Sequence, residues 1–336
     1  MGLDTAIAKP HDQLRELLAD ELEGVNQLIR ARMASEHAPR IPEVTAHLVE
    51  AGGKRVRPML TLAAAKLCGY DGPYHIHLAA TVEFIHTATL LHDDVVDESG
   101  QRRGRPAANL LWDNKSSILV GDYLFARSFQ LMIETGSMRV LDILANASAT
   151  IAEGEVLQLT AAQDVATDEA TYIQIVRGKT AALFAAATEV GGVIAEASDQ
   201  RTAALHAYGD ALGIAFQIAD DLLDYGGTSA IGKNIGDDFR ERKMTLPVIR
   251  AIAAAKADGA SDETEFWDRV IAKGKQAEGD LDHAIALFQK RGTLVSTRDE
   301  ALEWADRAKT ALAPLPDTPI RKLLCDLADY VVARIN

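Results

Sequence analysis

The feature that most constrains the fold of this chain is a run of 140 residues without proline, from Ala107 to Leu246. Proline interrupts helix interiors because it lacks a backbone N–H and its ring clashes with the preceding turn. The run is rich in Ala, Leu, Ile, Glu and Gln, which favour helix, and it shows little of the apolar–polar alternation of half-buried strands. The sequence therefore predicts an all-α protein.

Helix-favouring segments and turn residues predict where the helices lie. Aliphatic residues recur near helical spacing over residues 11–34, which predicts an amphipathic N-terminal helix that packs on the core. A glycine-rich segment, Gly226–Asp238, is expected to be a mobile loop, and polar breaks are expected near 257–263 and 291–298. Residues 1–336 are expected to form a single domain. Further helices are expected near residues 76–98, 116–135, 138–164, 169–195 and 200–225.

The net charge and the cysteine content narrow the expected partners and compartment. The formal net charge of −14 argues against nucleic acid as a partner, because nucleic-acid phosphates bind basic surfaces. Cys68 and Cys325 do not form a CxxC pattern, which favours a reduced, cytoplasmic setting. The N-terminus has no apolar signal core, and no segment approaches the length of a membrane span. We therefore expect at most peripheral contact with a membrane.

Two acidic clusters share the pattern DDxxD. The first, "DDVVD", follows the apolar segment "FIHTATLLH", and the second, "DDLLD", follows "LGIAFQIA". Residues four apart share one face of a helix, so the first and last aspartates of each cluster point the same way. One such cluster would equally suit a solvated helix end, but two with the same spacing, each after a buried helix, indicate a common ligand. The aspartates are Asp93, Asp94, Asp97, Asp220, Asp221 and Asp224.

The ligand that these aspartates require is a cation, because crowded carboxylates raise one another's pKa values unless positive charge relieves them. The spacing lacks the loop pattern of a helix–loop–helix calcium site, and the chain has no paired Cys or suitably spaced His ligands for zinc. Magnesium fits better, because it takes one or two carboxylates and completes its shell with water and substrate phosphate. The sequence thus predicts magnesium and a phosphorylated substrate.

Basic residues beside Gly or Pro agree with a phosphorylated substrate. Arginine binds phosphate oxygens through two N–H groups at once, and lysine acts as a movable point charge. The chain has no GxxxxGK[ST] or GxGxxG loop, so a nucleotide is not the expected phosphate carrier. The basic candidates are Lys54, Arg55, Arg57, Arg102, Arg103, Lys179, Lys233 and Lys243.

Together with the aspartates, these residues belong to an ordered set of motifs between Val44 and the C-terminal "DYVVAR". The motifs are "GGKRVRP", "FIHTATLLHDDVVDES", "RRGRP", "LVGDYL", "EGEVLQL", "GKTAALF", "FQIADDLLDY", "GKNIGDD" and "KMTLP". The set resembles the trans-polyprenyl diphosphate synthase family, and most closely its long-chain bacterial members, such as octaprenyl, decaprenyl and solanesyl diphosphate synthases. The resemblance implies the class I isoprenoid synthase fold, an antiparallel helix bundle around a deep central cavity. It also implies a homodimer, with both acidic clusters facing the mouth of the cavity.

The resemblance implies a role for each candidate residue. Three magnesium ions, with manganese as the alternative metal, would be bridged to an allylic diphosphate by Asp93, Asp97 and Asp220. Further ligands, or residues that support the ligands, would be Asp94, Asp221 and Asp224. The same diphosphate would be held by Arg102, Lys179, Lys233 and Lys243. Isopentenyl diphosphate would be held by Lys54, Arg57, His86 and Arg103, although His86 taken alone is better explained as a core histidine. A carbocation would be stabilised by the oxygen dipoles of Thr180 and Gln217.

The reaction that the resemblance implies is sequential head-to-tail condensation of isopentenyl diphosphate onto farnesyl or geranylgeranyl diphosphate. Ala88 lies five residues before Asp93, about 7.5 Å below the metal site on a helix. The small side chains of Ala88 and Thr89 would leave a tunnel open toward Ile85 and Phe84. Phe129 or Met132 would form a deeper floor, or pack in the core. We expect a product longer than farnesyl, and by resemblance a quinone side-chain precursor of about eight to ten isoprene units (about C40–C50).

Three other interpretations remain at this stage. A non-catalytic subunit of a heteromeric prenyltransferase would typically lack one acidic cluster or several cations, whereas both sets are present here. A short-chain farnesyl or geranylgeranyl diphosphate synthase is disfavoured by the small side chain at Ala88. A helical metal-storage bundle would need Glu-x-x-His pairs on facing helices, and the sequence offers no convincing set.

Overall fold

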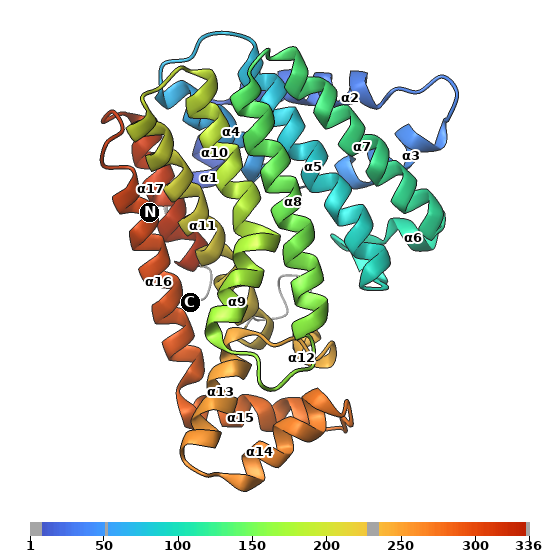
Figure 1. Cartoon of the computed structure of the whole chain (residues 1–336), viewed down its shortest axis with the longest axis vertical. Coiled ribbons are helices and arrows are strands. Elements are labelled where there is room, and N and C mark those ends of the chain that lie inside the picture. The colour runs from blue at the N-terminus through green and yellow to red at the C-terminus, as the bar shows by residue number, and fades with distance from the viewer. Residues whose placement is uncertain (1–8, 51–52, 227–234, 334–336) are drawn as a thin grey trace, which may run out of the picture. The chain divides into compact units, whose positions relative to one another are not determined.

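The computed structural model describes residues 9–50, 53–226 and 235–333 (Figure 1). The prediction of an all-α protein is confirmed, because helices make up nearly all of the regular structure in these ranges. The strands among the described residues are β1 (Gln101–Arg102) and β2 (Arg105–Pro106), which pair antiparallel as a small hairpin. No helix in the described part of the chain is long and apolar enough to cross a membrane.

The N-terminal part of the chain forms several short helices and two long ones. The long helix α5 runs uninterrupted because its sequence, "YHIHLAATVEFIHTATLLHDDVV", contains neither glycine nor proline. The other long helix, α7, begins where the carboxylate of Asp113 accepts the backbone N–H of Ser116 at 2.6 Å, which satisfies one of the unpaired donors of its first turn. The bounds are α1 (Pro10–Leu17), α2 (Ala19–Met33), α3 (Arg40–Glu50), α4 (Val56–Leu67), α5 (Tyr74–Val96), α6 (Ala108–Leu111) and α7 (Asn114–Glu134).

The remaining described residues form further α-helices and two π-helical turns. These turns are η1 (Arg177–Ala181), between α9 and α10, and η3 (Asp268–Ala272), after α14. The bounds of the α-helices are α8 (Met138–Ala161), α9 (Glu169–Val176), α10 (Ala182–Ile194), α11 (Asp199–Gly226), α12 (Asp237–Arg240), α13 (Leu246–Ala257), α14 (Ser261–Trp267), α15 (Asp280–Arg291), α16 (Thr293–Ala311) and α17 (Pro319–Ala333).

Most expected helices occur where the sequence predicts them, with three differences. The helix expected over 11–34 divides into α1 and α2 at Leu18, whose backbone angles (φ −110°, ψ 20°) are not helical. The helix expected over 169–195 contains the turn η1, which side-chain periodicity does not reveal. The break expected near 291–298 is present but shorter, because a single residue, Gly292, separates α15 from α16.

The chain divides into two compact units. The first unit comprises Met1–Ser148, Leu183–Gly209 and Ala311–Asp326, and the second comprises Ala149–Ala182, Asp210–Thr310 and Leu327–Asn336. The boundary therefore falls within α8, α11 and α17, after the first residue of α10 and before the last residue of α16. That residues 1–336 form a single domain stays a prediction.

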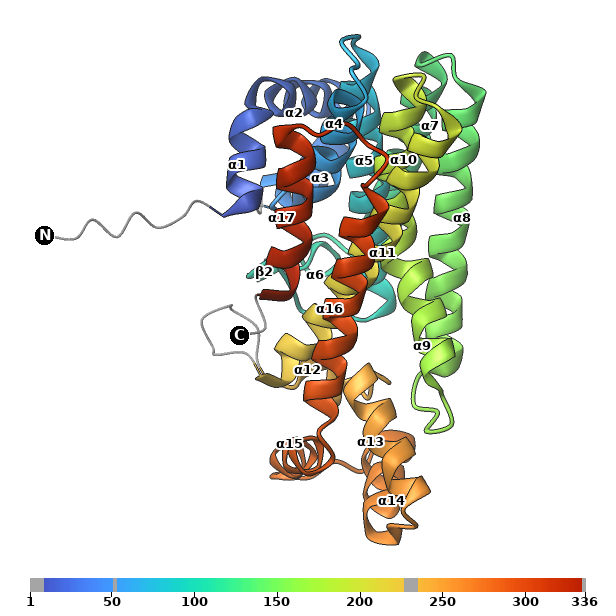
Figure 2. The same cartoon turned by 90° about the vertical axis from the view of Figure 1, so that its left-hand side faces the viewer.

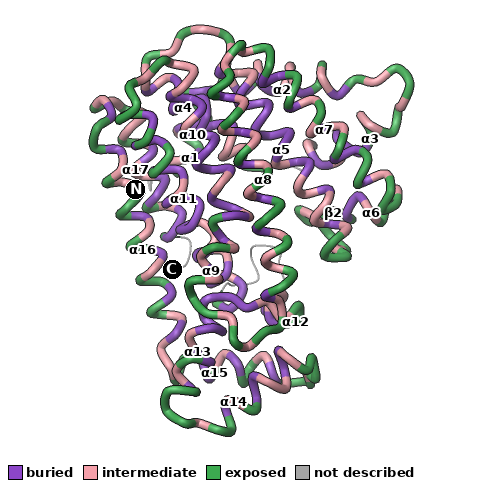
Figure 3. The backbone as a smooth tube through the Cα atoms, in the orientation of Figure 1, coloured by how far each residue is buried: buried purple, intermediate pink, exposed green. Residues whose placement is uncertain are grey.

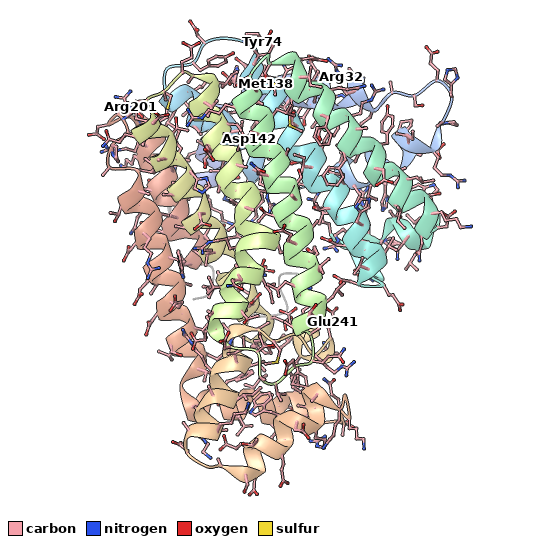
Figure 4. The ribbon with its side chains drawn as sticks, in the orientation of Figure 1. Arg32, Tyr74, Met138, Asp142, Arg201 and Glu241 are labelled. Atoms are coloured by element: carbon pink, nitrogen blue, oxygen red, sulfur yellow. The ribbon has the colours of Figure 1, made fainter. Side chains whose placement is uncertain are left out.

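In the first unit, the core forms around α5. This helix packs against α7 and α4 (Figure 1), and α1 and α2 contact α4 (Figure 2). Both α4 and α5 are buried along most of their length (Figure 3), with Leu60, Leu62 and Phe84 almost fully excluded from solvent. Each such side chain contributes about 1.5–3 kcal/mol to folding when removed from water. Helix α2 is also held to α7 by an ion pair between Arg32, labelled in Figure 4, and Glu134, with a nitrogen–oxygen distance of 2.7 Å.

In the second unit, aromatic side chains fix the C-terminal end of α11. Tyr225 packs edge-on against Phe288 of α15 with ring centroids 5.0 Å apart, and Phe288 stacks on Trp267 of α14 at 5.6 Å. All three side chains are buried. Because Tyr225 directly follows Asp224, this packing positions the second acidic cluster.

Candidate active site

The first acidic cluster lies at the C-terminal end of α5 in the first unit. Asp93 is half-buried and Asp97 is exposed, whereas Asp94 is fully buried. One carboxylate oxygen of Asp94, Oδ1, accepts two hydrogen bonds from the guanidinium of Arg102, at 2.8 Å from Nε and 2.5 Å from Nη2. Arg102 lies on β1, directly before the hairpin turn through Gly104 (φ +74°). Asp94 is therefore held by the protein itself.

Three arginines lie around one glutamate of α5; Arg55 and Arg57 are half-buried and Arg103 is exposed. Glu83, on α5, is buried and forms an ion pair with Arg55. Burial lowers the pKa values of Arg57 and Arg103, and the charge of Glu83 partly opposes this shift. Arg103 donates to the backbone carbonyl of Leu48 at 3.2 Å. Glu83 is thus the negative charge that balances a cluster of three arginines, a group that would repel one another without it.

His86 lies one helical turn beyond Glu83 and contacts Arg57. The distance from His86 Nε2 to Arg57 Nη1 is 3.3 Å, and the Arg57 guanidinium lies 4.4 Å from the centroid of the Phe184 ring. Burial, and then the charge of Arg57, lower the pKa of His86 well below its ordinary value. Burial also lowers the pKa of Arg57, to about 10. His86 is therefore neutral at pH 7, and its Nε2 is available to accept the hydrogen of Arg57.

The second acidic cluster belongs to the second unit, where Asp221 occupies the centre of a hydrogen-bond network. Its carboxylate accepts the hydroxyl of Tyr172 at 2.6 Å through Oδ2 and the side-chain amide of Gln217 at 2.8 Å through Oδ1. The Gln217 oxygen in turn accepts the hydroxyl of Thr180 at 2.8 Å. Burial, and then the charge of Asp238, raise the pKa of Asp221. Burial, and then Asp221, also raise the pKa of Tyr172.

Asp224, the last aspartate of this cluster, caps the start of α12. Its two carboxylate oxygens accept the backbone N–H groups of Asp237 and Asp238, each at 3.1 Å. Burial, and then the charge of Asp238, raise its pKa to about 6. Lys243 follows in the same turn, with its ammonium 2.5 Å from Glu241, labelled in Figure 4, and 3.4 Å from Asp238. Asp224 therefore holds the backbone at the C-terminal end of the glycine-rich segment.

The π-helical turn η1 presents Lys179 and Thr180. The Lys179 ammonium lies 2.9 Å from a carboxylate oxygen of Glu155 on α8. At this point α8 and η1 are in backbone contact, because a Cβ added to Gly154 would lie 2.7 Å from the backbone nitrogen of Lys179. A Cβ added to Gly178 would lie 2.8 Å from the Cα of Gly154. Only glycine fits at either position, so this contact fixes where the turn lies on α8.

The predicted site residues are distributed over the two units. The first unit contains Asp93, Asp94, Asp97, Lys54, Arg57, His86, Arg102 and Arg103. The second unit contains Asp220, Asp221, Asp224, Lys179, Thr180, Gln217 and Lys243. Lys233 and residues 227–234 of the predicted loop lie outside the described residues. That the two acidic clusters face each other across a cavity stays a prediction.

The residues predicted to set product length lie on the buried part of α5. Phe84, Ile85 and Ala88 are almost fully buried, and Thr89 donates its hydroxyl to the backbone carbonyl of His86 at 2.9 Å. Their role as tunnel residues stays a prediction. The suggestion that Phe129 forms a deeper floor or packs in the core is wrong, because its side chain is 41% exposed, whereas Met132 is fully buried.

The roles of Glu83 and Tyr172 are not among those that the sequence patterns predict. Glu83 is the single acidic residue in the apolar segment "LAATVEFIHTATLL", and a lone acid in a buried helix requires a partner, which was a usable signal. Tyr172 carries a weaker signal, because a tyrosine in the apolar stretch "YIQIV" is equally typical of a core residue. Its partner, Asp221, is 49 residues away in the sequence.

The donor groups present suit magnesium. The six aspartates offer only carboxylate oxygens, the hard ligands that this ion prefers. Within the described residues, no three acidic, histidine or cysteine side chains converge as a complete metal cage. Magnesium takes one or two carboxylates and completes its shell with water and phosphate oxygens, which suits clusters of aspartates.

Comparison with known proteins places these observations in a family. The family model described as "Polyprenyl synthetase" matches residues 38–288. Octaprenyl diphosphate synthase from Escherichia coli (strain K12) is 42% identical over 324 residues, which cover 96% of this chain and 98% of that protein. A decaprenyl diphosphate synthase structure from Rhodobacter capsulatus is 71% identical, with a TM-score of 0.92 over 97% of this chain and 99% of that chain. A polyprenyl synthase structure from Caulobacter crescentus, complexed with calcium and isoprenyl diphosphate, is 51% identical, with a TM-score of 0.91 over 97% of this chain and 98% of that chain.

Proposed function

Because this chain belongs to the polyprenyl synthetase family, we propose that it is a long-chain trans-polyprenyl diphosphate synthase. The observation that carries the proposal is the 71% identity to a decaprenyl diphosphate synthase over 97% of the chain. The presence of both DDxxD clusters and their basic neighbours supports catalysis by this chain alone. The product would be a quinone side-chain precursor of about eight to ten isoprene units, in keeping with the octaprenyl and decaprenyl names of its relatives.

The reaction joins an allylic diphosphate to isopentenyl diphosphate. The C–O bond of the allylic substrate breaks to give diphosphate and an allylic carbocation, and the terminal alkene carbon of isopentenyl diphosphate attacks this cation. A proton then leaves, and the released diphosphate accepts it. The protein must therefore stabilise negative charge on the leaving group and keep water from the cation.

The acidic clusters would hold the metal and, through it, the allylic diphosphate. Three magnesium ions, or manganese in their place, would be held by Asp93, Asp97 and Asp220, with support from Asp94, Asp221 and Asp224. When bound, the metal neutralises charge that develops on the leaving diphosphate. Asp94 forms a buried ion pair with Arg102, and Asp221 lies in a hydrogen-bond network. These contacts support a role for the two aspartates in orienting neighbouring groups, while other aspartates hold the metal.

Basic side chains would hold the two diphosphates. The allylic diphosphate would contact Arg102, Lys179, Lys233 and Lys243. Isopentenyl diphosphate would contact Lys54, Arg57, His86 and Arg103. In the second of these sets, neutral His86 accepts from Arg57 and keeps that guanidinium in place beside the Phe184 ring.

The decisive experiment is an elongation assay with the purified chain. The protein is incubated with magnesium, farnesyl or geranylgeranyl diphosphate and labelled isopentenyl diphosphate, and the extracted prenyl chains are sized. We expect products of about eight to ten isoprene units, no activity after chelation of magnesium, and loss of activity in Asp93→Asn. The matched control is Asp142→Asn, a charge-equivalent change on the exposed face of α8, labelled in Figure 4.

Each alternative function predicts a different result in this assay. Products that stop at farnesyl or geranylgeranyl would identify a short-chain synthase. A pure chain that elongates nothing until a second protein is added would identify a subunit of a heteromeric prenyltransferase. An Asp93→Asn variant as active as wild type would contradict the proposed metal site.

We also propose that the protein is a homodimer. Several large apolar side chains of the first unit are exposed on α7 and at the start of α8: Leu119 and Ile133 (each 66% exposed), Phe129 (41%) and Met138 (75%). Met138 is labelled in Figure 4. The α7 residues fall on one face of the helix, and exposed apolar side chains gathered on one face mark an interaction surface. Analytical ultracentrifugation should give twice the chain mass for wild type and the monomer mass for Leu119→Glu/Ile133→Glu, and a monomeric wild type would contradict the proposal.

A further inference from the structure

Tyr172, Asp221, Gln217 and Thr180 form a hydrogen-bond chain whose donors all run toward one acceptor. Tyr172 and Asp221 are 4% and 5% exposed, so neither can exchange its partner for bulk water. The Tyr172 hydroxyl lies 2.6 Å from Asp221 Oδ2, and Gln217 Nε2 lies 2.8 Å from Asp221 Oδ1. Thr180 Oγ1 lies 2.8 Å from Gln217 Oε1. Both side-chain oxygens of Asp221 thus accept a hydrogen bond, one from Tyr172 and one from Gln217, so every donor in the chain points toward Asp221.

The direction of these bonds fixes the orientation of the Gln217 amide. With its NH₂ group on Asp221, the amide must present its oxygen to Thr180, whereas the flipped amide would set an oxygen against a carboxylate oxygen. Thr180 has a single O–H, and that hydrogen is used on Gln217. The Thr180 oxygen therefore offers only lone pairs to any other group. An oxygen with exposed lone pairs is suited to stabilise a developing positive charge.

We propose that Tyr172 is a positioning residue of the prenyl-transfer site, which orients Thr180 and Gln217 through Asp221. The inference rests on the proposed function and adds to it a residue outside the acidic clusters. The Tyr172 hydroxyl occupies Oδ2 of Asp221, so that the carboxylate is held with Oδ1 toward Gln217. Without this hydroxyl, Asp221 can rotate about its Cβ–Cγ bond, and the Gln217 amide and the Thr180 hydroxyl lose their single orientation. Tyr172 does not touch the reacting atoms and acts only through its neighbours.

The test measures steady-state elongation by the full chain and its Tyr172→Phe variant at saturating magnesium. We expect kcat to fall about tenfold, which corresponds to about 1.4 kcal/mol, while the KM values for both diphosphates stay within about twofold of wild type. The matched control is Tyr208→Phe, which removes another fully buried hydroxyl, one that donates to the Leu324 carbonyl at 2.8 Å in the first unit. The control should lower thermal stability without changing kcat.

A double-mutant cycle separates positioning from general damage. If Tyr172 acts through Gln217, Tyr172→Phe should change kcat less than twofold in a Gln217→Leu background. The inference would be overturned if Tyr172→Phe changed kcat no more than the Tyr208→Phe control does. It would also be overturned if Tyr172→Phe lowered kcat by the same factor in the Gln217→Leu background as in wild type. A wild type that makes no prenyl chains would overturn the proposed function, and with it this inference. A fully active wild type with a fully active Tyr172→Phe variant would overturn the inference alone.

A second variant keeps the inference testable if Tyr172→Phe does not fold. Asp221→Asn keeps the shape of the side chain but adds a donor, so that the direction of the bonds is no longer fixed. We expect kcat to fall about tenfold, with the magnesium concentration for half-maximal activity changed by less than about threefold. An unchanged kcat at saturating magnesium, with a magnesium requirement raised more than tenfold, would assign Asp221 to the metal and overturn the inference.

Discussion

Replacement of Gly154 by alanine tests whether the contact between α8 and η1 positions catalytic groups. The new Cβ would lie 2.7 Å from the backbone nitrogen of Lys179 and 2.9 Å from the backbone of Gly178, where ordinary contacts begin near 3.4 Å. The two backbones must therefore separate by about 0.7 Å. Overpacking of this kind costs about 1–3 kcal/mol, and the better helix propensity of alanine offsets about 1 kcal/mol. We expect a net loss of at most about 2 kcal/mol in the free energy of unfolding.

The effect on activity should be larger than the effect on stability. Lys179 and Thr180 lie on the turn that must move, and a misplacement of about 1 Å in a positioning group costs about 100-fold in rate. A shift of about 0.7 Å should therefore lower kcat for elongation by about 10- to 100-fold. Gly178→Ala, whose Cβ would lie 2.8 Å from the Cα of Gly154, should behave in the same way.

Two measurements are needed for each variant: urea unfolding followed by circular dichroism, and incorporation of labelled isopentenyl diphosphate. Glu153→Ala is the matched control, because Glu153 is the exposed neighbour of Gly154 and its replacement should change stability by less than about 0.5 kcal/mol. The reasoning is refuted if Gly154→Ala retains kcat within about twofold of wild type. In that case the glycine contact serves only packing, and the position of η1 is set elsewhere.

Three further predictions concern α5. Glu83→Ala should lower the free energy of unfolding by about 3 kcal/mol, because it leaves the charge of Arg55 without its partner. Inorganic diphosphate should restore part of that loss. Equal unfolding curves for the variant and wild type would contradict this prediction. Burial, and then Arg57, lower the pKa of His86, so the folded protein favours the neutral imidazole. Wild type should therefore lose stability relative to His86→Gln as the pH falls below about 6.5, while the difference in stability between the two proteins stays constant above that pH. Urea unfolding of both proteins from pH 8 to pH 5.5 checks the direction of this change. Ala88→Phe should shorten the prenyl product measured by chromatography, and an unchanged length would count against a tunnel along this face.

Much of the fold and of the candidate site could be predicted from sequence because the signals are local. The proline-free run and the 3.6-residue periodicity act on neighbouring residues, so the positions of α5, α7, α8 and α11 agree with prediction to within a few residues. The spacing of the acidic clusters is likewise a property of single helices. The error at Phe129 shows the limit, because α7 carries apolar residues on its exposed side as well as on its buried side.

The sequence by itself determined that two DDxxD clusters end long apolar helices, and that basic residues accompany them. Only the tertiary structure decided which aspartates are hydrogen-bonded to other side chains of the protein. Asp94 meets Arg102 eight residues away and Asp221 meets Tyr172 49 residues away, so these pairs depend on how hairpins and helices pack. Spacing tells which side chains share a face, but burial and partner geometry determine what that face contacts. For the same reason, the arginine cluster around Glu83 and the glycine contact at η1 are visible only once the chain is folded.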